Sequence, residues 1–182
     1  MDDRLPGIRP RPSLGRRLDM AARRSFPCVV TVLLLLLAAA PFGLAGQAQI
    51  QFAVALASVY FWSVFRPLSM PPAAVFSLGV LVDLLGYAPL GSSVVILLAL
   101  HAMVVNGRQV LGRGGFVLVW LAFAVLAVLA AGLQWALTAL LTFRVLPLSP
   151  ALFGAALAIA LYPLLAVPFG TAHRTLAEPE RA

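Results

Sequence analysis

The feature that most constrains this chain is a series of apolar runs, each close to the length of a membrane-spanning helix. Hydrophobic residues make up 62% of the 182 positions and charged residues only 10%, and water-soluble globular proteins do not have this composition. A helix needs about 20 apolar residues to cross a bilayer. Spanning strands would alternate apolar and polar residues, and these runs do not. The sequence therefore predicts an all-α integral membrane protein.

The apolar runs predict about six transmembrane helices. They are expected at Pro27–Ala45, Ile50–Phe65, Ala73–Tyr87, Leu90–Val105, Phe116–Thr142 and Ala151–Phe169. The third and fourth are short, because about 15 residues at 1.5 Å each give roughly 22 Å against a hydrocarbon core of about 30 Å. Two arrangements therefore remain open for them: two short spans, or a re-entrant hairpin that turns at residues 87–89.

Arginine and proline residues set the limits of the predicted domains. The first 26 residues carry seven arginines and three prolines, so residues 1–26 are predicted to form a disordered basic cytoplasmic arm. Residues 27–170 would form the six-helix membrane domain and residues 171–182 a short cytoplasmic tail. The arm lacks interleaved aromatic residues, which favours a topology signal or contact with anionic lipid over nucleic-acid recognition.

The arginines also indicate the orientation. With six spans, all but one of the arginines beyond the arm fall on the same side as the arm. Those on the arm's side are Arg66, Arg108, Arg113, Arg174 and Arg181, and Arg144 lies opposite. The positive-inside rule then places both termini in the cytoplasm.

Four aromatic residues stand just before the first of these arginines. They are Tyr60, Phe61, Trp62 and Phe65. Aromatic side chains are enriched where a membrane meets water, so this cluster is expected to anchor the helix at the cytoplasmic interface.

Asp83 is the candidate functional residue, because it is the only acidic residue in the apolar part of the chain. A carboxylate inside a bilayer must face protein, pair with another group or titrate. Phe76, Gly79 and Gly86 have helical spacing to Asp83, which places them on one face with it. Small residues let another helix approach closely. Asp83 is therefore predicted to face a protein interface, either as a hydrogen-bonded structural acid or as part of a partner's docking surface.

The residues around Asp83 do not form a catalytic set. Tyr87 lies four residues on and could donate its hydroxyl to the carboxylate, and Ser92 and Ser93 follow at a similar depth. Acid–base catalysis by a carboxylate needs a partner group, and His101 would be offset by roughly 9 Å along the helix axis. His101 is instead expected to pack at the cytoplasmic interface. With a single cysteine and no cluster of ligands, neither a metal nor a cofactor is predicted.

Several motifs between Tyr60 and Gly91 resemble, in order, the signature of the rod shape-determining protein MreD family. They are Tyr60-Phe61-Trp62, Pro67, Pro71-Pro72, Phe76-x-x-Gly79-x-x-x-Asp83-Leu84-Leu85 and Pro89-Leu90-Gly91. The signature covers 32 residues, and the rest of the chain matches in length and hydrophobicity. The basic arm is longer than the family pattern requires.

The resemblance implies a non-enzymatic inner-membrane component of the elongasome, which carries out peptidoglycan synthesis along the lateral wall and maintains rod shape. The expected partners are an MreC-like protein and, through it or directly, MreB, RodA and a penicillin-binding transpeptidase. It also implies a fold similar to the substrate-binding subunits of energy-coupling-factor transporters, a likeness that does not transfer function. The alternative function is a small-molecule-binding subunit of such a vitamin-type transporter, with Asp83, Tyr87, Ser92 and Ser93 lining its pocket.

In the scaffold interpretation, a partner's transmembrane helix docks on one surface of this segment. The residues expected to form or shape that surface are Tyr60, Trp62, Phe76, Gly79, Asp83, Gly86, Tyr87, Pro89 and Gly91. A buried polar residue that is satisfied only by the right partner would penalise wrong ones.

Overall fold

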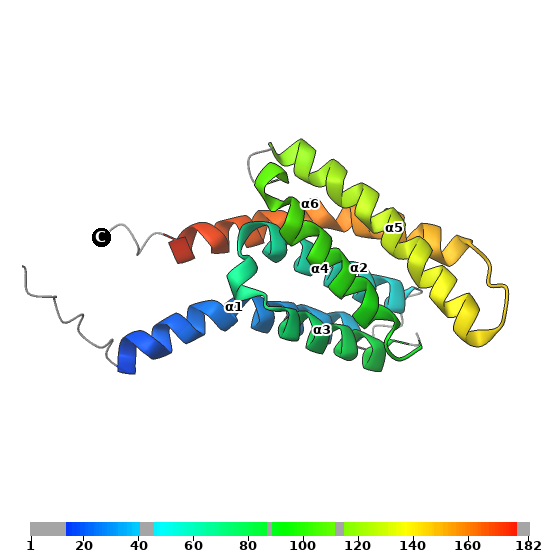
Figure 1. Cartoon of the computed structure of the whole chain (residues 1–182), viewed down its shortest axis with the longest axis horizontal. Helices are drawn as coiled ribbons and strands as arrows, with labels where there is room; N and C mark the ends of the chain where they lie inside the picture. Colours follow the sequence, from blue (N-terminus) through cyan, green and yellow to red (C-terminus); the bar gives the residue numbers. More distant parts are fainter. Residues whose placement is uncertain (1–13, 41–45, 87–88, 112–114, 178–182) are drawn as a thin grey trace, which may run out of the picture.

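The computed structural model describes residues 14–40, 46–86, 89–111 and 115–177, and within these ranges the regular structure is entirely helical. The elements are α1 (Leu14–Ala39), α2 (Gln47–Phe65), the 3-10 helix η1 (Pro67–Ser69), α3 (Pro72–Leu85), α4 (Ser92–Leu111), α5 (Phe116–Thr142) and α6 (Ser149–Ala177). The helices form one bundle, and the start of α1 and the end of α6 lie at the same end of it (Figure 1). The prediction of an all-α protein is confirmed for the described residues.

Three of the described helices are long and apolar enough to cross a membrane: α2, α5 and the Ser149–Thr171 part of α6. The apolar window of α2 is 72% buried in the bundle, whereas those of α5 and α6 are only 28% and 22% buried. The outer faces of α5 and α6 therefore carry exposed large apolar side chains, among them Leu121 and Leu164. An apolar surface of this extent is typical of a protein that faces lipid.

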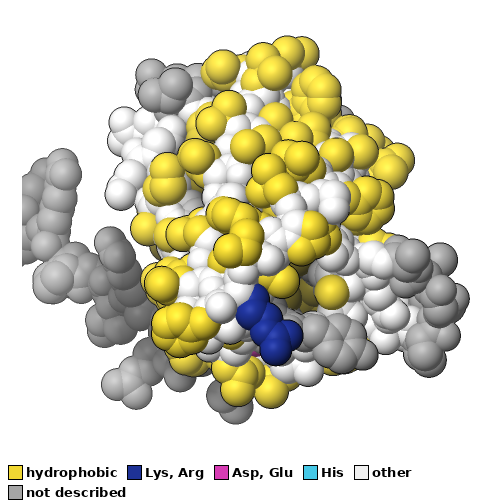
Figure 2. Space-filling view, turned by 90° about the vertical axis from the view of Figure 1, so that its right-hand side faces the viewer, with side chains coloured by type: hydrophobic (Ala, Val, Ile, Leu, Met, Phe, Trp, Pro, Cys, Tyr) yellow, Lys and Arg dark blue, Asp and Glu magenta, His cyan; other side chains and the backbone are white. Residues whose placement is uncertain are grey.

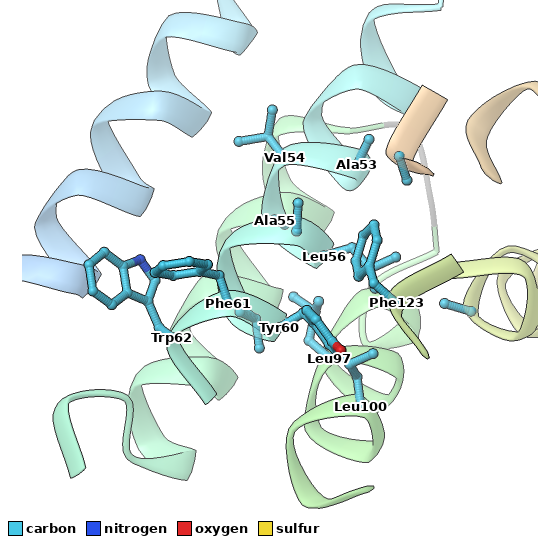
Figure 3. Packing of buried hydrophobic residues seen from close by; sticks show 14 of the residues in the cluster. Ala53, Val54, Ala55, Leu56, Tyr60, Phe61, Trp62, Leu97, Leu100 and Phe123 are labelled. Atoms are coloured by element: carbon cyan, nitrogen blue, oxygen red, sulfur yellow. The ribbon is translucent and has the colours of Figure 1, made fainter. Parts of the chain in front are cut away.

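α2 is the central helix, and it contacts each of the other five α-helices in the described ranges. Its residues 53–64 are buried on every side, as expected of a helix that is apolar all round. Ala53 and Ala55 allow neighbouring helices to approach, and larger side chains such as Leu56 and Tyr60 fill the space between them (Figure 3). The core of the protein is therefore built around α2.

The prediction that the aromatic residues near the end of α2 are interfacial anchors is wrong for three of the four. Tyr60, Phe61 and Trp62 are buried, and only Phe65 is partly exposed. The rings of Phe61 and Trp62 lie 5.3 and 5.2 Å from that of Phe169 in α6, measured between centroids. The reason is tertiary: α6 covers this end of α2, so the aromatic residues pack between helices instead of facing the membrane surface.

A second aromatic cluster joins α2 to α5 and α6. The ring of Tyr60 lies 5.0 Å from that of Phe123 and 5.5 Å from that of Tyr162, measured between centroids. The Tyr60 hydroxyl donates a hydrogen bond of 2.8 Å to the backbone carbonyl of Val119. A buried tyrosine is therefore both packed and hydrogen-bonded, as its hydroxyl requires.

The predicted helix limits are correct in part. α5 has the predicted bounds, and α2 ends at the predicted Phe65. α3 is short, because its 14 residues give about 21 Å. The fourth segment is not short: α4 has 20 residues, about 30 Å. Its last part carries the exposed polar residues Asn106 and Arg108, so the helix continues beyond the apolar run that predicted it.

The predicted disorder of the basic arm is wrong for its second half. Residues 14–26 form the beginning of α1, which continues through Pro27 to Ala39. Residues 171–177 of the predicted tail likewise belong to α6. Residues 1–13 and 178–182 lie outside the described ranges. At residues 14–26 and 171–177 the helices continue into charged sequence. A hydropathy pattern detects only the apolar part of a helix, so the predicted segments were shorter than the helices.

α3 and α4 pack against each other most closely at Gly79. A Cβ atom at this position would lie 2.6 Å from the Cα of Val94 and 3.0 Å from its backbone nitrogen. Gly79 thus permits the close approach that its spacing from Asp83 predicts, and the approaching helix is α4 of the same chain.

We expect Gly79→Ala to destabilise the protein by about 1–3 kcal/mol, because the backbone of α4 must move away from the added methyl group. Gly107→Ala is the matched control, since a Cβ at that position in α4 meets nothing within 4 Å. It should be neutral or stabilising by up to about 1 kcal/mol, because alanine has the higher helix propensity. Thermal unfolding in detergent, followed by tryptophan fluorescence, would compare them. An unchanged midpoint for Gly79→Ala would contradict the packing.

Candidate functional site

Asp83 lies in the last turn of α3 and is only 3% exposed. Its Oδ2 accepts a hydrogen bond of 2.7 Å from the N–H of Gly91, and its Oδ1 accepts one of 3.0 Å from the N–H of Ser93. These N–H groups lie at the beginning of α4, where backbone donors have no partner within their own helix. A negative charge is also favoured at this end of a helix by the helix dipole. Asp83 therefore caps α4 from the neighbouring helix.

The turn between α3 and α4 has the geometry that this cap requires. Gly86 ends α3 with φ −93° and ψ 179°, and its N–H bonds to the carbonyl of Val82. Gly91 has φ +93°, in the left-handed region that glycine adopts most readily. The Ser92 hydroxyl donates to the carbonyl of Pro89 at 2.8 Å. These contacts orient the first N–H groups of α4 toward the carboxylate.

Of the residues predicted to share a helical face with Asp83, Gly86 lies beyond the end of α3, so it belongs to the turn and not to a helix face. Phe76 lies on the same face of α3, two turns before Asp83, but it is 52% exposed while Asp83 is buried. Helical spacing gives the direction of a side chain, but burial depends on which neighbours cover that turn of the helix. Tyr87, the other predicted neighbour of Asp83, lies outside the described residues.

Gln134 of α5 joins the same turn. Its Nε2 donates to the Ser92 Oγ at 3.3 Å, while the Ser92 hydroxyl is itself a donor to Pro89. Three helices therefore meet at this point: α3 through Asp83, α4 through Ser92 and α5 through Gln134. The structure brings Asp83, Ser92 and Ser93 together, as the sequence predicted, but Asp83 binds the backbone of this segment and not the serine hydroxyls.

His101 belongs to a different part of the core. It is buried, and its Nδ1 lies 2.7 Å from the Oγ of Ser63 in α2. His101 therefore packs inside the bundle, between α4 and α2, and α4 continues for ten residues beyond it, to Leu111. Asp83 and His101 have separate hydrogen-bond partners, so they do not form an acid–base pair with each other in this structure.

Within the described part of the chain, no group of three or more His, Cys, Asp or Glu residues could hold a metal ion. No protein-family model, curated protein or solved structure matches the chain. The site is therefore described by its own geometry alone: a buried carboxylate that joins two helices through backbone N–H groups.

Sequence reasoning missed this cap, although a signal for it was present. Gly91, Ser92 and Ser93 precede a long apolar run, and small polar residues of this kind are typical of the beginning of a helix. An acid eight residues before Gly91, on the preceding helix, lies within reach of those free N–H groups once the chain turns back.

We expect Asp83→Leu to destabilise the protein strongly, because it leaves the buried N–H of Ser93 without an acceptor, at about 1–3 kcal/mol, and removes the acceptor of the part-buried Gly91 N–H as well. Asp83→Asn should cost less, because its side-chain carbonyl can still accept one of the two bonds. Leu84→Ala, at an exposed neighbouring position, should change stability little. The three variants would be compared by thermal unfolding in detergent. If Asp83→Leu were as stable as Leu84→Ala, the cap would not hold α3 against α4.

Proposed function

We propose that this chain is a non-enzymatic scaffold of the bacterial lateral cell-wall elongation machinery, as its MreD-like segment at residues 60–91 implies. The observation that carries the proposal is the use of Asp83. The one acidic residue of the membrane domain holds the beginning of α4 against the end of α3. A costly intramembrane carboxylate thus serves to fix the shape of the segment that carries the resemblance.

The other buried polar groups support the same proposal. His101 contacts Ser63, and the Tyr60 hydroxyl contacts the backbone of Val119. Each contact joins two helices of the bundle. A general acid or base must instead reach a reacting group on a substrate, and these side chains are occupied within the core.

We further propose that all six helices span the membrane and that both termini are cytoplasmic. Arg24 donates to the backbone carbonyl of Leu68 at 3.0 Å, which places it beside the link between α2 and α3, where Arg66 also lies. Arg108 is in the last turn of α4, at this same end of the bundle, and Arg144 follows α5 at the other end. This asymmetry fits the positive-inside rule. A short α3 is compatible with spanning if the bilayer thins locally.

Labelling of single cysteines in a Cys28→Ser background tests this topology. Leu68, Leu90 and Val145 are exposed positions in three different connections. In spheroplasts, a membrane-impermeant maleimide should label Leu90→Cys and Val145→Cys, while Leu68→Cys should react only after lysis. Leu90→Cys that reacts only after lysis would instead indicate a hairpin of α3 and α4 entering from the cytoplasmic side.

The partner-facing residue of α3 is proposed to be Phe76 and not Asp83. The carboxylate of Asp83 is buried and bonded within the chain, and Gly79 contacts α4. Phe76 lies on the same helix with its ring exposed. In this proposal the cap fixes the position of α3, and the exposed part of α3 around Phe76 contacts the transmembrane helix of an MreC-like protein. RodA, MreB and the penicillin-binding transpeptidase would associate through that protein or directly.

Depletion in the native host with plasmid-borne variants tests the function. Depleted rods should widen and become round, and the wild-type gene should restore them. Phe76→Ala should insert normally, recover several-fold less MreC-like protein on purification and restore shape poorly. Phe153→Ala on α6 is the matched control, since Phe153 is 53% exposed and Phe76 is 52% exposed.

Two results would contradict this proposal. If both phenylalanine variants restored shape and recovered the partner equally, α3 would not be the docking face. If depletion left cell shape unchanged and made growth depend on an added nutrient, the vitamin-type transporter subunit would replace the scaffold.

A further inference from the structure

A cavity of about 310 Å³ lies at the end of the bundle where α3 turns into α4. Its walls come from α2, α3, α4, α5, α6 and the connection before α6. The described lining residues include Phe52, Ser93, Gln134, Trp135 and Ala151. Pockets for small organic ligands begin at about 300 Å³.

The cavity wall is mainly apolar and, among the described lining residues, uncharged. Figure 2 looks onto this end of the molecule, where hydrophobic side chains predominate and a basic side chain lies among them at the surface. Asp83 is not among the described lining residues, and its two carboxyl oxygens already accept from the N–H groups at the beginning of α4. A charged group inside the cavity would therefore meet no opposite charge from the described wall, at high cost. The occupant that fits this wall is neutral.

Two buried oxygens in the wall residues have no hydrogen-bond partner: the Oγ of Ser93 and the Oε1 of Gln134. Ser93 is only 1% exposed, and its own N–H is bonded to Asp83. The contact of the Gln134 Nε2 with Ser92 fixes the orientation of the amide, because the Ser92 hydroxyl already donates to Pro89. The amide oxygen of Gln134 is therefore the free acceptor, and the Ser93 hydroxyl is a free donor.

We propose that this cavity binds a neutral lipid alcohol, meaning a molecule with an apolar chain and one hydroxyl group. A hydroxyl is the smallest group that both donates and accepts a hydrogen bond. Neither oxygen has surface open to the cavity, so a small rotation of the Ser93 and Gln134 side chains, both of which line the cavity, accompanies binding. The ligand hydroxyl would then donate to the Oε1 of Gln134 and accept from the hydroxyl of Ser93, while the chain lies against Phe52 and Trp135. A buried oxygen without a hydrogen-bond partner is unfavourable, so a ligand that bonds to these two oxygens gains affinity by satisfying them. This binding does not depend on the proposed scaffold function.

Quenching of Trp135 fluorescence tests this proposal in the full-length protein, reconstituted in dioleoylphosphatidylcholine vesicles. The probes are 12-bromododecan-1-ol, 1-bromododecane without the hydroxyl, and 12-bromododecanoate at a pH where it is ionised. Trp62 and Trp120 do not line the cavity, and the Trp135→Phe variant shows how much of the fluorescence quenching comes from these two residues. The alcohol should give a saturable component that Trp135→Phe abolishes, with an apparent affinity at least threefold higher than that of either other probe.

Three variants locate the binding. Ala151→Leu fills the cavity and should lower the apparent affinity for the alcohol at least tenfold. Ala160→Leu makes the same change at an exposed position of α6 and should leave that affinity unchanged. Ser93→Ala should lower the apparent affinity for the alcohol three- to tenfold and leave the affinity for the bromoalkane unchanged. It should not lower thermal stability, because the Ser93 hydroxyl has no hydrogen-bond partner in the fold.

Any of three outcomes would overturn the proposal. The first is quenching of Trp135 that rises with probe concentration without saturating. The second is a response to Ala151→Leu that equals the response to Ala160→Leu. The third is an ionised probe that binds as tightly as the alcohol, which would show that the cavity does not select a neutral ligand.

Discussion

The arrangement of this bundle depends on one interaction, the contact of the Asp83 carboxylate with the N–H groups of Gly91 and Ser93. In a bilayer, neither the carboxylate nor the first N–H groups of α4 can be left without partners. Each needs the other, and both are satisfied only when the chain turns back tightly after α3. Gly91 supplies the backbone conformation of that turn, and Gly79 lets the two helices come close enough for it.

The central position of α2 determines which helices are left to face lipid. α2 contacts every other α-helix described, so its apolar residues are used within the protein. α5 and α6 each have one side on the bundle and expose most of their apolar surface. Apolar composition alone therefore does not mark a lipid-facing helix, since the most buried helix and the two most exposed ones are all apolar enough to span.

The sequence predicted what depends on local chemistry and missed what depends on neighbouring helices. It predicted the helical class, the bounds of α5 and the burial of Asp83 in protein, because long apolar runs and an isolated acid have few alternatives. It placed Tyr60 and Trp62 at the membrane surface, because nothing in an apolar run shows which helix will cover it. The cavity was equally invisible from the sequence, since its walls come from five helices that meet only in the folded protein.

The cap and the cavity share one hydrogen-bonded chain, and this links the lining of the cavity to the position of α3. Gln134 donates to Ser92, and Ser92 donates to Pro89 in the turn that Asp83 holds. Successive hydrogen bonds polarise one another in a medium of low dielectric constant. A ligand that donates to the free oxygen of Gln134 would therefore strengthen the contact between its amide nitrogen and Ser92. Occupancy of the cavity would then tie α5 more firmly to the turn between α3 and α4, and so to the helix that carries Phe76.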